Sequence, residues 1–170
     1  GLDAAAARRV PAVELRAPLA GAPSAQTLAG AVTAWRRAGG RHLSVHLPPI
    51  GWDPAAGAVT GREAFQDGVE LAGDLAATAV TVHMPRVTCQ ALEGGGSARA
   101  CLEAAYAELL APAVSGGMAI GVENMHLASG EPDDRRRHYG YTPGECLQWV
   151  EMLRGRLPGG RVGLHLDIGH

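Results

Sequence analysis

Five short apolar segments recur along the chain, and each shows the alternation of side chains that is typical of a β-strand. They span residues 10–16, 41–46, 79–83, 118–123 and 161–167. Four stretches with helical periodicity lie between them, near residues 24–38, 61–77, 98–114 and 143–154. A regular alternation of strands and helices predicts an α/β domain, with a parallel sheet that helices cover from outside.

Each apolar segment ends in side chains that commonly bind metal ions or anions. In a barrel of alternating strands and helices, active sites lie where the strands end and the βα loops begin. We therefore expect these end residues to meet at one edge of the sheet, around a divalent metal ion. In chain order they are Glu14 with Arg16, His46, His83, Glu123, and Asp167 followed by His170.

Side-chain parity divides the strand segments into two faces. In the segment 41–46, one face carries only His and Ser, and the other carries Leu43 and Val45. The segments that end at His83, Glu123 and Asp167 show the same division into a small or polar face and an aliphatic face. We expect the aliphatic face to pack on helices and the other to line a barrel interior. Deeper in that interior, His42 and His165 should make hydrogen bonds.

The first segment places Glu14 and Arg16 on the same inward face. One interpretation is that they form a structural ion pair at the mouth of the barrel. The other is that Arg16 binds an anionic group of a substrate. The sequence leaves both open.

Composition narrows the class of protein. Hydrophobic residues make up 46% of the 170 residues, charged residues make up 19%, and the net charge is −2. These values are typical of a globular domain and do not favour a broadly basic nucleic-acid surface. No apolar stretch approaches the ~20 residues of a membrane span. Three cysteines without framework spacing favour free thiols and a cytoplasmic location. The chain contains no lysine, which excludes a Schiff-base lysine from this segment.

Five strands are too few for an eight-stranded barrel, which typically needs about 250 residues. We expect residues 1–170 to form a single partial (β/α)8 TIM-barrel domain of about five βα units, with the first strand and the last two absent.

The ordered set of strand-end motifs resembles the xylose-isomerase-like TIM barrels. That superfamily includes sugar and sugar phosphate isomerases and epimerases, and the endonuclease IV type of DNA-repair enzyme. The resemblance spans nearly the whole chain, and it is carried by the set in order rather than by any one motif. The motifs are Val13-Glu14-Leu15-Arg16, Val45-His46-Leu47-Pro48, Val82-His83-Met84-Pro85, Val122-Glu123-Asn124 and Leu166-Asp167-Ile168-Gly169-His170.

The resemblance implies a divalent metal ion (Mn, Mg, Co or Zn) bound by Glu123 and Asp167. A buried carboxylate is costly unless it is paired or metal-bound, which agrees with this role. In the endonuclease branch, His46 and His83 would add zinc ligands. His170 would be a metal ligand in that branch and a catalytic or substrate-contacting residue in the isomerase branch.

Other side chains are candidates for binding a substrate. Besides Arg16, His46 and His83, these include Trp52, which would either stack on a sugar or anchor its loop, and His126, three residues after Glu123. The charged segment 131–141 is either a solvated loop whose opposite charges compensate one another, or a lid whose arginines meet an anionic group. Capping boxes are predicted at 60–63 and 142–145.

Three functions remain open. The first is a metal-dependent isomerase or epimerase of a sugar or hydroxy-carbonyl substrate, which works through an enediolate with Glu123 as ligand and proton-transfer base. The second is an endonuclease IV-like zinc phosphodiesterase that acts on abasic DNA, although no basic stripe supports it. The third is a non-catalytic truncated barrel that binds or scaffolds a partner, with a homo-oligomer as one possibility.

Overall fold

The computed structural model describes residues 1–17, 25–94, 96–125 and 135–167, and the structural statements below concern these residues. Five parallel strands form one sheet in the order β1-β2-β5-β6-β7. This confirms the predicted parallel α/β architecture. The strands are β1 (Ala12–Arg16), β2 (His42–His46), β5 (Ala79–His83), β6 (Ala119–Glu123) and β7 (Arg161–His165).

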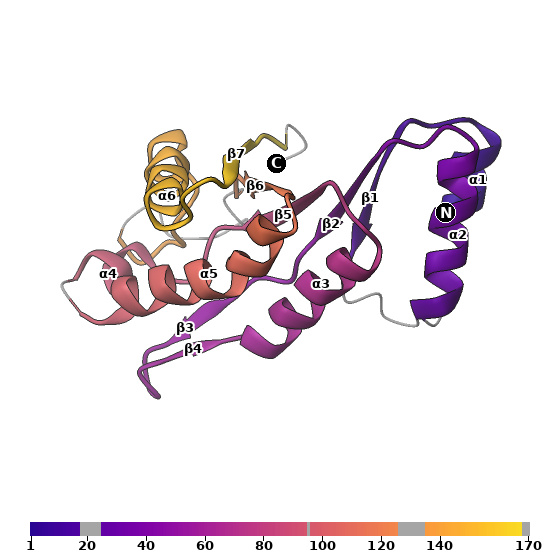
Figure 1. Cartoon of the computed structure of the whole chain (residues 1–170). Helices are drawn as coiled ribbons and strands as arrows, with labels where there is room; N and C mark the ends of the chain where they lie inside the picture. The colour runs from indigo at the N-terminus through magenta and orange to yellow at the C-terminus, as the bar shows by residue number, and fades with distance from the viewer. Residues whose placement is uncertain (18–24, 95, 126–134, 168–170) are drawn as a thin grey trace.

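Four long helices connect these strands and follow one another along one side of the sheet (Figure 1). They are α2 (Ala25–Arg37), α3 (Arg62–Asp74), α5 (Ala98–Ser115) and α6 (Pro143–Arg156). In the described part of the chain, no helix combines the length and the apolar character that crossing a bilayer requires.

Three small elements were not predicted from the sequence. They are the helices α1 (Leu2–Ala7) and α4 (Cys89–Glu93), and a hairpin of β3 (Gly51–Asp53) and β4 (Ala58–Thr60). The hairpin turn is held by Asp53, whose Oδ1 accepts hydrogen bonds from the amides of Ala55 (2.8 Å) and Ala56 (3.2 Å). Such local side-chain bonds stabilise a turn without a hydrophobic pattern, so periodicity could not reveal it.

The aliphatic face of the sheet forms the core, as parity predicted. Its side chains on β2, β5 and β6 are completely buried: Leu43, Val45, Val80, Val82, Ile120 and Val122. In the last segment the prediction holds for Val162, which is buried, but not for Leu164 on β7 and Leu166 just beyond it, which are 42% and 65% exposed. Because β7 is an edge strand, no described element covers these two residues.

Helix starts show one correct and one wrong prediction. Thr142 and Glu145 form the predicted capping box at the start of α6. The predicted box at α3 does not form, because Thr60 belongs to β4 and Gly61, with φ +79°, precedes the helix without a side-chain cap. A β-strand that runs up to the helix therefore displaces the cap by one residue.

Strand register places His83 and Glu123 at one level, and His46 two residues below them. β5 and β6 pair so that His83 lies opposite Glu123, and β2 pairs with β5 so that His46 lies opposite Thr81. Parallel strands end at the same edge of the sheet, so these side chains gather at the carboxyl ends where barrel enzymes carry their sites.

Candidate metal centre

His46, His83 and Glu123 form the centre of the candidate site, at the ends of β2, β5 and β6. One potential ligand atom from each of them lies within 4.8 Å of the others. The Nε2 atoms of the two histidines are 2.8 Å apart, and their ring centroids are 4.5 Å apart. His46 and Glu123 are buried, and His83 is partly exposed. Three metal-binding side chains from three strands thus converge on one point.

The carboxylate of Glu123 is only partly satisfied. Its Oε2 lies 3.0 Å from Nδ1 of His83 and 3.4 Å from Nε2 of His46, yet this buried oxygen receives no directed hydrogen bond from any described residue. A buried polar oxygen without a donor is costly. An electrophile placed between the carboxylate and the imidazoles would remove that cost.

Glu14 orients His46. The Nδ1 of His46 lies 3.0 Å from Oε1 of Glu14, and a carboxylate can only accept, so Nδ1 donates and Nε2 carries the lone pair. The hydroxyl of Thr81 donates to Oε2 of Glu14 at 2.6 Å. The hydrogen bond from His46, helped by Thr81 against the opposing effect of burial, lowers the pKa of Glu14 to about 2. A carboxylate that fixes the tautomer of a histidine is a common support for a metal ligand.

Of the two interpretations of Glu14 and Arg16, the structural ion pair is not formed. Glu14 binds His46 and Thr81 instead, and the exposed guanidinium of Arg16 makes no hydrogen bond or ion pair with any described residue. Parallel pairing with β2 places the imidazole of His46 within reach of Glu14. The spacing of Glu14 and Arg16 along one strand could not predict this contact with another strand. Arg16 as a contact for an anionic substrate stays a prediction.

Tyr106 supports His83 from the helical side. Its hydroxyl donates a 2.8 Å hydrogen bond to the carbonyl of His83, and its buried ring packs edge-on against Phe65 and Trp149. Burial raises the pKa of Tyr106, which keeps the phenol protonated as a donor. Tyr106 was not predicted from the sequence, because nothing in a helical apolar pattern marks one tyrosine as facing a strand end.

Asp167 lies just beyond β7 and is tied to β6 by Asn124. The side chain of Asn124 donates to the carbonyl of Asp167 at 3.1 Å and accepts from its amide at 2.7 Å. Asp167 does not belong to the group of three within 4.8 Å, and its role as a ligand stays a prediction. No role was predicted for Asn124. The feature that could have suggested one is its position directly after Glu123.

The remaining predicted positions have different outcomes. Trp52 lies on β3, pairs with Val59 in the hairpin and packs partly buried on the core, which favours the anchoring role. His42 is exposed and His165 partly exposed, and neither ring makes a hydrogen bond with a described residue, so the expectation of bonded interior histidines is wrong here. The described sheet is open, so this face is not enclosed. His126 and His170 lie outside the described residues.

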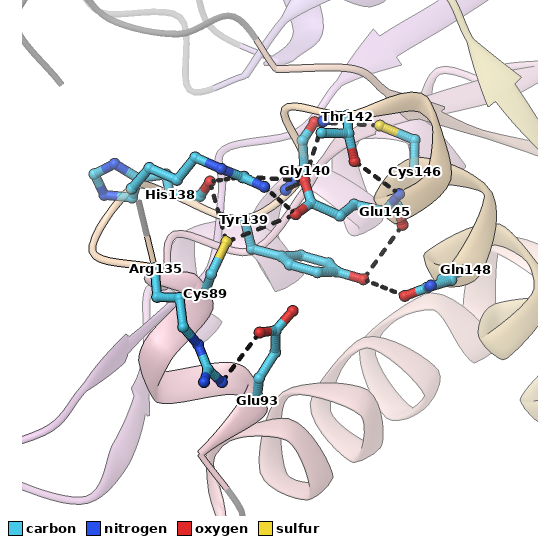
Figure 2. Close-up of polar contacts among 11 residues, drawn as sticks. Cys89, Glu93, Arg135, His138, Tyr139, Gly140, Thr142, Glu145, Cys146 and Gln148 are labelled. Carbon is cyan, nitrogen blue, oxygen red and sulfur yellow. Dashed lines mark hydrogen bonds and ion pairs between the residues drawn. The ribbon is translucent and has the colours of Figure 1, made fainter. Parts of the chain in front are cut away.

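Two arginines of the charged segment pair with carboxylates, which agrees with the interpretation in which opposite charges compensate. Arg137 forms a two-pronged contact with Glu145, at 2.6 and 3.1 Å, and Arg135 lies 3.3 Å from Glu93. Figure 2 shows these contacts around α4 and the start of α6. Through this bidentate pair, the guanidinium of Arg137 is bound to a carboxylate of the protein itself.

The inner face of the sheet beneath the triad is hollow. Small side chains at Ala79, Ala119 and Gly121 leave an open depression of about 500 Å³, which is also lined by Glu14 and His165. A depression of this volume is within the range of small-molecule sites. The residues that line it lie on the strands below the triad, and none of the three triad side chains is among them.

The donor set fits a divalent metal ion. Two imidazoles and one carboxylate suit zinc well and are also used for other first-row divalent metals. The orphaned Oε2 of Glu123 and the lone pair at Nε2 of His46 face the same point, as ligands to one cation must. We conclude that the residues present can hold such an ion.

Comparisons with known proteins agree on the fold. No family model and no curated protein sequence matches the chain. A D-tagatose 3-epimerase-like protein is 22% identical, with a TM-score of 0.63 over 94% of this chain and 57% of its own. A xylose isomerase domain protein from Planctomyces limnophilus is 16% identical, with a TM-score of 0.62 over 98% and 58%. D-psicose 3-epimerase, solved in the presence of D-fructose, is 15% identical, with a TM-score of 0.64 over 98% and 56%.

The chain thus spans less than two thirds of the length of each of these neighbours. At such identities the likeness concerns the fold alone. It agrees with the fold that the resemblance implied, and the chain has the fold of part of a TIM barrel.

Proposed function

We propose that this chain carries part of the active site of a divalent-metal-dependent isomerase or epimerase that acts on a sugar or sugar phosphate. The observation that carries the proposal is the convergence of His46, His83 and Glu123 at the carboxyl edge of a parallel sheet. The fold shared with epimerase and isomerase-domain proteins gives additional support.

Each residue of the site has a distinct part in this proposal. Glu123 and His46 are the ligands, together with His83, and Asp167 at the end of β7 is a further candidate. Glu14 holds the lone pair of His46 toward the site by accepting a hydrogen bond from Nδ1. A divalent cation held there would supply Lewis acidity to adjacent oxygens of the substrate.

Interconversion of sugars at a carbon next to a carbonyl needs a group that removes and returns a proton. Glu123 is a carboxylate within the triad, and we propose that it takes part in this transfer. The inner face of the sheet below the triad is open, and we propose that part of the sugar lies against it. The exposed guanidinium of Arg16, on the same inner face, is the candidate contact for a phosphate group.

One observation favours a second candidate, a zinc phosphodiesterase of the endonuclease IV type that acts on abasic DNA. Two of the three clustered side chains are histidines, and imidazole-rich sites favour zinc over magnesium. Clustered zinc ions promote hydrolysis of phosphodiesters. The net charge of −2 does not favour this candidate.

Metal content and solvent exchange separate the two candidates. The chain is purified without chelators, its metals are counted by mass spectrometry, and a panel of ketoses and aldoses is incubated with it in D2O. About one metal ion per chain, with deuterium incorporated next to the sugar carbonyl, is the result expected for an isomerase. A Glu123→Gln variant should lose both signals.

Other outcomes overturn the proposal. About three zinc ions per chain and cleavage of DNA at abasic sites would establish the phosphodiesterase instead. A chain that binds no divalent metal would exclude both enzymes and leave a binding or scaffold protein with a barrel-like fold.

A further inference from the structure

The segment 135–142 is held against the loop after β5 and the start of α4 by backbone hydrogen bonds. The amides of Cys89 and Gln90 donate to the carbonyls of Arg137 (2.9 Å) and Arg135 (2.6 Å), and the amide of Tyr139 donates to Val87 at 2.9 Å. This loop begins directly after His83. The segment therefore adjoins the candidate metal centre through its backbone, although none of its described side chains belongs to the triad.

Glu145 makes contacts with several residues of this segment (Figure 2). Its buried carboxylate accepts hydrogen bonds from Arg137 and from the amides of Gly140 (3.1 Å) and Thr142 (3.0 Å). The thiol of Cys89 lies 3.6 Å from its Oε1. An arginine side chain, two backbone amides and a thiol on α4 thus all contact this one carboxylate. The capping box of α6 requires only the contact with the amide of Thr142.

Gly140 connects the carboxylate of Glu145 to the segments that directly follow the candidate ligands His83 and Glu123. Its amide donates to Glu145, and its carbonyl accepts from the amide of Met125 at 3.1 Å, two residues after Glu123. It has φ +96°, and a Cβ here would overlap the buried side chain of Met84, the residue after His83. The backbone of Gly140 is therefore wedged between the two strand ends, with no space for a side chain.

We propose that Glu145 is a positioning residue of the metal centre, which holds Gly140 where it sets the spacing between His83 and Glu123. The proposal rests on the proposed function in taking these two residues as ligands. Glu145 touches neither of them, so its effect passes through Gly140 to Met84 on one side and Met125 on the other. The alternative is that Glu145 only caps α6 and stabilises the fold.

The test compares Glu145→Gln with Glu151→Gln. Both residues lie on α6 and both pair with an arginine, but Glu151 is exposed and its partner, Arg154, lies on the same helix. Two readouts are taken at one pH. The first is the ring-nitrogen NMR spectrum of His46 and His83 in metal-free protein. The second is the affinity for Co²⁺, followed by its visible absorption.

A positioning role predicts that Glu145→Gln shifts the ring signals of His83 and weakens Co²⁺ binding about tenfold, the lower end of the range for supporting residues. Glu151→Gln should match the original chain in both readouts. Unchanged ring signals and unchanged Co²⁺ affinity in Glu145→Gln would overturn the proposal, even if the variant unfolds at a lower temperature.

The two readouts keep this proposal separate from the proposed function. If the original chain binds no Co²⁺, the metal centre fails, and the ring signals of metal-free protein alone decide whether Glu145 positions His83. If Glu145→Gln does not fold, Arg137→Gln is measured instead, because it keeps the carboxylate and its backbone donors. The same shift, or its absence, then supports or overturns the proposal.

Discussion

Glu123 and Glu145 are both buried but differ in how their charges are satisfied. Glu145 receives two hydrogen bonds from Arg137 and two from backbone amides. Glu123 faces two histidines, and its buried Oε2 accepts no hydrogen bond from a described residue. The hydrogen bonding of Glu145 is therefore complete within the protein, whereas Glu123 has an oxygen that a cation could bind.

This difference separates a carboxylate that builds the fold from one that is available for binding. A satisfied buried carboxylate contributes to stability, whereas an unsatisfied one lowers stability until a ligand completes it. Proteins retain such costs mainly at functional sites. The contrast also suggests how to test each glutamate, because the effects of substitution should have opposite signs.

The largest effect is expected from Arg137→Met. This change leaves the carboxylate of Glu145 buried without its cation, and breaking a buried pair from one side costs about 3 kcal/mol of unfolding free energy. Urea denaturation measures it. Arg154→Met is the matched control, because Arg154 and Glu151 are both largely exposed, and such pairs contribute less than about 1 kcal/mol. Equal losses in the two variants would contradict the structural role given to Arg137.

Zinc should stabilise the original chain, and the Glu123→Gln variant should not respond. At a concentration one hundred times the dissociation constant, a ligand bound only by the folded state adds about 2.7 kcal/mol. In EDTA the order should reverse, and Glu123→Gln should be more stable by about 1 kcal/mol, because it removes an unsatisfied buried oxygen. Thermal unfolding with and without zinc measures both. A zinc response retained by Glu123→Gln would place the metal elsewhere.

Acid should weaken the fold through Glu145. Burial opposes its ionisation, but Arg137 and the amides of Thr142 and Gly140 outweigh this and lower its pKa from the ordinary 4.5 to about 2. The folded state therefore takes up this proton only at lower pH than the unfolded chain does. Its contribution is complete above about pH 4.5 and is lost as pH falls toward 2, by about 2 kcal/mol.

Unfolding free energies measured between pH 5 and 2.5 check this dependence. Glu145→Gln should flatten the curve. Glu14→Gln should flatten it less, although the pKa of Glu14 is also lowered to about 2, because a third of its side chain is exposed and solvent screens its contacts. A steeper curve in Glu145→Gln than in the original chain would show that the sign is wrong.

The sequence predicted that His46, His83 and Glu123 lie at one edge of the sheet, but not which contacts support them. Strand periodicity and parallel pairing fix the face of each side chain and the edge at which it lies. Glu14 was expected on this face with Arg16 as one possible partner, because the contact with His46 depends on the pairing of two strands. Tyr106 was missed because its role depends on how α5 packs against β5, which no local pattern encodes.

Capping at the starts of α3 and α6 shows the same limit on a smaller scale. Thr142 and Thr60 have the same spacing to a following glutamate, but only Thr142 accepts a hydrogen bond from the amide at that position, at 3.3 Å. Thr142→Ala should therefore cost about 1 kcal/mol of unfolding free energy. Thr60→Ala, at an exposed strand position without a capping bond, should change it by less than about 0.5 kcal/mol. Urea denaturation of both variants measures the two losses of unfolding free energy. An equal loss in Thr60→Ala and Thr142→Ala would mean that the sequence pattern predicts caps better than the observed hydrogen bonds do.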